Sequence, residues 1–157
     1  MGGFSQPSYL FEEKLCQSIG CMVYYSETEG RYRGMVMNES TENYLETILV
    51  LNHRLGNVRS VDIANEMNFK KPSVSVAMKN LRENGYITVS PEGYIHLTAS
   101  GLEVAEKIYE RHTILSGWLM MLGVDPRVAA EDACKIEHDV STESFEAIKR
   151  HINAGKP

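Results

Sequence analysis

The feature that most constrains the fold is a change of hydrophobic period between residues 40 and 97. Apolar side chains first recur at three- and four-residue spacing, which predicts amphipathic helices, and then alternate with polar ones, which predicts strands. The turn signals Asn84-Gly85 and Pro91-Glu92-Gly93 separate the last elements. The predicted elements are helices at 40–55, 60–67 and 72–83, then strands at 87–89 and 94–97.

Helix, short helix, turn, helix and hairpin is the order of a winged helix-turn-helix domain, in which one helix enters the major groove of double-stranded DNA. Its third helix would turn Val74, Met78 and Leu81 inward and polar residues outward. Although the chain carries a net charge of −5, residues 54–90 hold six basic and three acidic side chains, a local balance of +3. Lysine and serine can bind phosphate oxygens or base edges there. The predicted DNA-binding residues are Lys70, Lys71, Pro72, Ser73, Ser75, Lys79 and Asn80.

The second half of the chain predicts one long helix and two shorter ones. Thr98 would cap a helix over 99–122, Asp125 with Pro126 would begin the next, and Ser141 the last. The long helix has more apolar surface than one small lobe can cover, so we expect it to pair with a second copy in an isologous homodimer. The predicted fold is therefore mainly α, with a winged helix-turn-helix domain at 38–98 and a helical domain at 99–157.

A set of ligand-type residues lies in this second half. Cys134, Glu137 and His138 stand at i, i+3 and i+4, so on a helix they project from one face. A thiolate, a carboxylate and an imidazole together suit a divalent transition metal. From the residues alone a plainer interpretation stays open, because cysteine is often a small buried hydrophobe, and glutamate and histidine often lie on a solvated face.

Four segments of the chain together resemble the diphtheria toxin repressor and manganese transport regulator family. They are Thr41-Glu42-Asn43-Tyr44-Leu45-Glu46, Lys71-Pro72-Ser73-Val74-Ser75, Arg111-His112 and Asp132-Ala133-Cys134-Lys135-Ile136-Glu137-His138. The resemblance covers about residues 38–152 in order. It implies a winged-helix DNA-binding domain and a helical metal-binding and dimerisation domain. It also implies a cytoplasmic homodimer that binds a palindromic operator and represses metal-uptake genes when metal is bound.

Carried over residue by residue, the resemblance implies a metal site that mixes features of two branches. Cys134 matches the iron-type members and Glu46 the manganese-type members, whereas Asn43 stands where the former place Met and the latter Asp. Thiolate favours Fe(II), or Zn(II) and Co(II) in vitro, over Mn(II), which prefers oxygen ligands. We therefore expect Fe(II) or Mn(II). The implied ligands are Asn43, Glu46, His112, Cys134, Glu137 and His138.

Two other functions fit parts of the sequence. One is a metal-independent winged-helix regulator that uses the long helices only to dimerise. The other is a small metal-dependent hydrolase that uses His112, Glu137 and His138 around an open coordination position. The sequence shows no obvious nucleophile-and-base pair and no Gly-rich phosphate loop, so we do not expect an enzyme.

The composition favours a cytoplasmic protein that does not span a membrane. The apolar runs are far shorter than a bilayer span, and three unevenly spaced cysteines fit a reducing compartment better than a disulfide framework. Residues 1–37 lack a sustained period and are interpreted as an N-terminal extension. A second hypothesis is that translation begins at Met35 or Met37, since bases that encode Arg31-Tyr32-Arg33-Gly34 can form a purine-rich ribosome-binding site.

Overall fold

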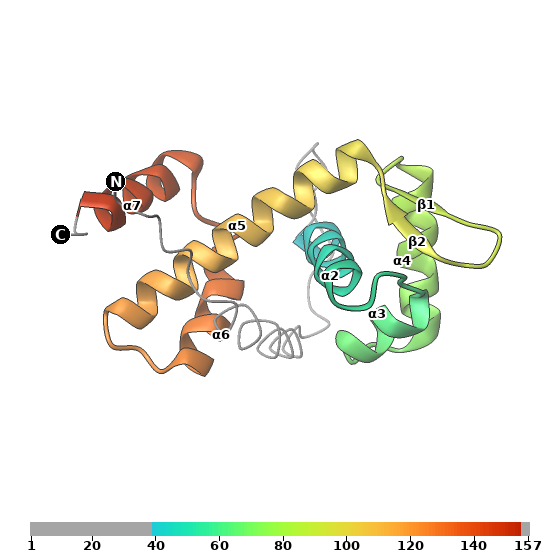
Figure 1. Cartoon of the computed structure of the whole chain (residues 1–157), viewed down its shortest axis with the longest axis horizontal. Helices are drawn as coiled ribbons and strands as arrows, with labels where there is room; N and C mark the ends of the chain where they lie inside the picture. Colours follow the sequence, from blue (N-terminus) through green and yellow to red (C-terminus); the bar gives the residue numbers. More distant parts are fainter. Residues whose placement is uncertain (1–38, 155–157) are drawn as a thin grey trace, which may run out of the picture.

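The computed structural model describes residues 39–154 of the 157-residue chain, so the expectations for residues 1–37 lie outside the described residues. The described part is mainly helical, as predicted, with one two-stranded sheet (Figure 1). The elements are α2 (Glu39–Leu55), α3 (Ser60–Glu66), α4 (Lys71–Glu83), β1 (Ile87–Val89), β2 (Ile95–Leu97), α5 (Ala99–Met121), α6 (Pro126–Ile136) and α7 (Thr142–Ala154).

The first lobe contains α2, α3, α4 and the hairpin around one apolar core. In the hairpin, β1 and β2 pair antiparallel, with Ile87 opposite Leu97. The N–H of Ile95 also donates to the main-chain oxygen of Val58 at 2.8 Å, which ties the sheet to the loop after α2. The inner side chains of α4, namely Val74, Met78 and Leu81, are all buried in this core.

The long helix α5 connects this lobe to α6 and α7, and α2 packs against it (Figure 1). As predicted, the Thr98 hydroxyl caps α5 by accepting the N–H of Gly101 at 3.2 Å. A Cβ at Gly101 would lie 2.0 Å from the main-chain oxygen of Tyr86, so the absence of a side chain lets α5 start against the hairpin. A second core around Leu115, Ala133 and Phe145 joins α5 to α6 and α7.

Three predicted helix ends shift by one or two residues. Ser40 and Thr41 are residue types that commonly cap a helix and were expected to cap the first one, but both lie inside α2. Ser60, expected for the same reason to cap the second helix, is the first residue of α3, whose N-cap is Arg59; the Arg59 N–H donates to the Asp62 carboxylate at 2.8 Å. The helix with Cys134 ends at Ile136, so Glu137 and His138 follow it in the next turn.

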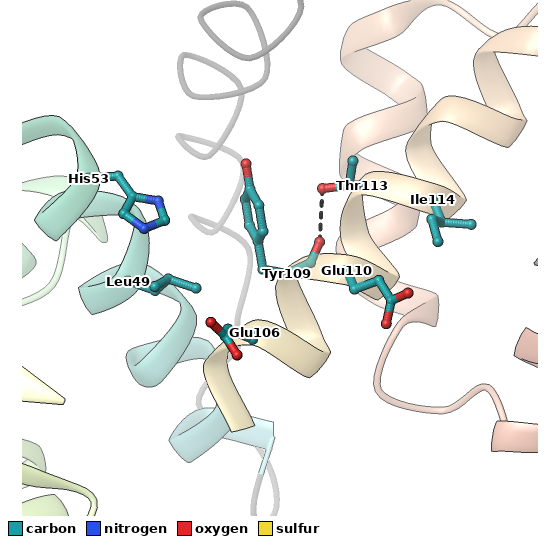
Figure 2. Close-up of a pocket in the computed structure, with 7 residues that line it drawn as sticks. All are labelled: Leu49, His53, Glu106, Tyr109, Glu110, Thr113 and Ile114. Carbon is teal, nitrogen blue, oxygen red and sulfur yellow. Dashed lines mark hydrogen bonds between the residues drawn. The ribbon is translucent and has the colours of Figure 1, made fainter. Parts of the chain in front are cut away.

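A pocket of about 360 Å³ opens between α2 and α5. Figure 2 shows Leu49 and His53 of α2 facing Glu106 and Tyr109 of α5 across this space. None of the candidate metal ligands is among its described lining residues. Of the helices between residues 39 and 154, none has both the length and the apolar character needed to cross a lipid bilayer.

Candidate metal centre and DNA-binding face

The candidate metal ligands come from α2, from α5, and from α6 with the turn that follows it. Cys134 lies in the last turn of α6, and Glu137 caps this helix with α-helical backbone angles. The Glu137 N–H donates to the oxygen of Ala133 at 2.9 Å. Because the backbone keeps its helical path through Glu137, this side chain stays on the same face as Cys134, although the helix itself has ended.

His112, Cys134 and Glu137 form the inner part of the site. One donor atom from each lies within 4.8 Å of the others, an arrangement that could hold a metal ion. The Nδ1 of His112 is 2.8 Å from Oε2 of Glu137 and 3.5 Å from Sγ of Cys134. The His112 residue is 1% exposed and Glu137 is fully buried, whereas Cys134 is half-buried at the edge of the cluster.

His138 joins this inner cluster to α2. Its Nε2 is 2.8 Å from Oδ1 of Asn43 and 3.4 Å from Oε1 of Glu137. Its Nδ1 lies 2.7 Å from Oε2 of Glu42. The structure therefore brings together donors from α2, α5 and the turn after α6 that are as much as 96 residues apart in sequence.

Glu46, on α2, is also buried and is electrostatically linked to the other acidic and imidazole groups. Burial raises the pKa of Glu46 to about 7, with a further rise from the Glu137 charge that His112 and His138 partly offset. Desolvation by itself lowers the pKa of His112, but its hydrogen bond to Glu137 and the two carboxylate charges outweigh this and raise it. The same balance, with Glu42 and Glu137 as the partners, raises the pKa of His138.

These groups carry the donor types and the unsatisfied buried atoms that are typical of a transition-metal site. Oε1 of Glu46 and Nε2 of His112 are buried donor atoms without a hydrogen-bond partner within the described residues, and Oε1 of Glu137 forms no hydrogen bond there either, although it lies 3.4 Å from Nε2 of His138. Such orphaned atoms are costly in a protein interior unless another ligand satisfies them. Carboxylate and imidazole donors fit Fe(II) or Mn(II), and a thiolate donor fits Fe(II) better.

Two residues near the site received no role from sequence reasoning. Arg111 is buried, and its guanidinium donates to the main-chain oxygens of Glu137 at 2.8 Å and Val140 at 2.7 Å. These hydrogen bonds hold the turn that carries Glu137 and His138 against α5. Glu42 accepts a hydrogen bond from His138, as carboxylates beside metal-bound histidines commonly do. The spacing of Glu42 one helical turn before Glu46 was a signal that could have identified it.

The residues predicted to bind DNA lie on the outer side of the first lobe. Lys70 is the N-cap of α4, and the other six lie within this helix. All seven are exposed, whereas the opposite side of α4 is buried in the core. The Ser75 hydroxyl donates to the main-chain oxygen of Lys71 at 3.0 Å and keeps its lone pairs for an outside donor.

Comparison with known proteins identifies both halves of the chain. A family model described as "Iron dependent repressor, N-terminal DNA binding domain" matches residues 36–95. A second, described as "Iron dependent repressor, metal binding and dimerisation domain", matches residues 98–156.

Individual relatives agree with the family models. The transcriptional regulator MntR of Escherichia coli O6:H1 (strain CFT073) is 36% identical over 111 residues, which cover 71% of this chain and 72% of MntR. An uncharacterised HTH-type transcriptional regulator of Methanocaldococcus jannaschii is 36% identical over 115 residues, or 72% of this chain and 92% of the relative. The structure of the manganese regulator SloR matches with a TM-score of 0.65 and 28% identity, over 76% of this chain and 55% of the SloR chain. The chain belongs to the iron-dependent repressor family, which includes the MntR regulators.

Proposed function

We propose that the protein is a metal-dependent repressor of metal-ion homeostasis genes, which senses Fe(II) or Mn(II) and binds a palindromic operator as a cytoplasmic homodimer. Residues 38–98 would form its DNA-binding domain and residues 99–157 its metal-binding and dimerisation domain. The observation that carries the proposal is the set of buried and half-buried donors that links α2, in the first lobe, with α5 and α6.

The metal site would use donors from both domains. When bound, the cation supplies a positive charge at the point where several buried carboxylates and imidazoles converge. The thiolate of Cys134 favours Fe(II), whereas the oxygen donors and the likeness to the manganese regulator SloR favour Mn(II). The proposed ligands are Asn43, Glu46, His112, Cys134, Glu137 and His138.

The switch would act through the position of α2. Asn43 and Glu46 belong to α2 in the first lobe, whereas the other four ligands belong to the domain that would dimerise. Holding these groups together would set the separation of two α4 helices near one turn of DNA, about 34 Å. A preference of about 1.4 kcal/mol for this arrangement would change its population ratio tenfold.

The end of α5 supports the proposed dimer. Met121 and Leu122 are 62% and 63% exposed, and the neighbouring Trp118 is only partly buried. An apolar surface of this kind at the end of a helix would be covered by a second copy of the same domain. The family model that matches this half is described as a dimerisation domain.

The test is the mobility of DNA from the protein's own promoter, measured with Fe(II), with Mn(II) and with a chelator. We expect tight binding only with metal, and loss of the metal response in His138→Ala with the dimer still folded. Glu103→Ala, which changes an exposed residue of α5, is the matched control and should behave as wild type. Equal affinity with and without chelator would indicate a metal-independent regulator, and no binding to any DNA would overturn the proposal.

A further inference from the structure

Helix α4, which carries the predicted DNA-binding residues, exposes one large apolar side chain that does not pack into the core. Val76 is 61% exposed, although the other large apolar residues of this helix, Val74, Met78 and Leu81, are buried. Single exposed apolar residues are common on protein surfaces and need no explanation by themselves. What distinguishes Val76 is its place on the helix.

Val76 lies at the centre of the outward face of α4. At about 100° per residue, Pro72, Ser73, Lys79 and Asn80 all project within about 60° of it. These four neighbours are exposed as well. A helix inserted with this face toward a groove would therefore place Val76 closest to the base edges, with the polar side chains around it.

The chemistry of the major groove limits what such a side chain can contact. Base edges there present hydrogen-bond donors and acceptors, and the apolar group among them is the 5-methyl of thymine. Valine can neither donate nor accept, so packing it on a polar edge would desolvate that edge without replacing its hydrogen bonds. Packing it on a methyl group buries apolar surface on both partners.

We propose that Val76 reads a thymine in each operator half-site by contact with the thymine 5-methyl group. This inference rests on the proposed function, because it requires that α4 enters the major groove. It adds recognition of a methyl group, which the lysines and serines of α4 cannot supply because they contact phosphate oxygens or base edges through hydrogen bonds.

The experiment begins with the operator, which is selected from random DNA in the presence of Mn(II). Each thymine of the half-sites is then replaced by deoxyuridine, which pairs with adenine in the same way and lacks only the methyl group. We expect one thymine position in the half-site to respond. Loss of its methyl group in one half-site should weaken wild-type binding about fourfold, and loss in both half-sites should weaken it about fifteenfold.

Val76→Ala provides the second arm of a double-mutant cycle. Because Val76 is exposed, this variant should fold as wild type, which its thermal unfolding can verify. It should bind the thymine operator more weakly and lose its sensitivity to deoxyuridine at that one position. Leu102→Ala, which removes an exposed apolar side chain from α5, should keep the full deoxyuridine effect.

The outcomes separate this inference from the function on which it rests. If selection enriches no DNA, the proposed function fails and the inference fails with it. If an operator is bound but no deoxyuridine position weakens binding, the contact with thymine is wrong while the repressor remains. The same conclusion follows if deoxyuridine weakens wild type and Val76→Ala equally.

Discussion

Replacing Arg111 with methionine should destabilise the turn that carries Glu137 and His138 without changing the side chain of any candidate ligand. Arg111 holds the turn after α6 through hydrogen bonds to the main-chain oxygens of Glu137 and Val140, and a longer one of 3.4 Å to the Thr142 hydroxyl. Its guanidinium carbon also lies 5.2 Å from the centre of the Phe145 ring. Methionine keeps most of the apolar stem and removes all the donors.

The size of the effect follows from the two short bonds. A hydrogen bond from a charged donor contributes about 1.5–3 kcal/mol, and an acceptor left unpaired in the interior costs a similar amount. The bond to Glu137 is buried and the bond to Val140 is partly buried. We therefore take the lower value for each bond, which gives a loss of about 3 kcal/mol in the free energy of unfolding. For a chain of this length that corresponds to a fall in Tm of about 6–12 °C.

Thermal unfolding in excess chelator measures the stability lost with the Arg111 hydrogen bonds, without any contribution from bound metal. Arg111→Lys keeps the charge but not the fork of donors, so its Tm should fall by less. Arg127→Met removes an exposed arginine paired with Glu131 and should change the free energy of unfolding by less than about 1 kcal/mol. A Tm of Arg111→Met within about 2 °C of wild type would refute the reasoning.

The remaining predictions concern the start of α5 and the carboxylate beside His138. Gly101→Ala should destabilise the protein by about 2 kcal/mol or more in urea unfolding, because the new Cβ meets the Tyr86 oxygen. Gly117→Ala, in the same helix with open space around it, should instead stabilise by about 0.5–1 kcal/mol, and equal effects of the two would contradict this packing. Glu42→Gln should weaken Mn(II) binding about 10- to 100-fold in competition titrations with a fluorescent chelator, because His138 loses the carboxylate that orients its ring. Wild-type affinity in this variant would show that Glu42 has no such role.

Most elements of the fold could be predicted because they depend on local spacing. The three- and four-residue periods located α2, α4 and α5, and the alternation around Pro91-Glu92-Gly93 located the hairpin. Caps were less certain. Ser60 is the usual type of capping residue, yet Arg59 holds this position, since the Asp62 carboxylate accepts its main-chain N–H.

The candidate site could be predicted as a set of residue types but not as a geometry. Cys134 and Glu137 stay on one face although α6 ends at Ile136, because Glu137 keeps helical backbone angles, while His138 follows in the turn and contacts α2. Resemblance to a known family supplied the other three residues. Neither source suggested that Arg111 would fasten the turn, because that role depends on main-chain oxygens whose positions no pattern of side chains reveals.

By itself, the sequence determined which segments become helices and which side chains could bind a cation, since both depend on residue type and on distances of a few positions along the chain. Only the tertiary structure decided that Glu42 would meet His138 across 96 residues and that the carboxylate of Glu46 would lose contact with water. The physical reason is that burial and long-range contact are properties of packing. Helices α2 and α6 both pack against α5. The spacing of apolar residues along the chain does not specify the angles at which these helices pack.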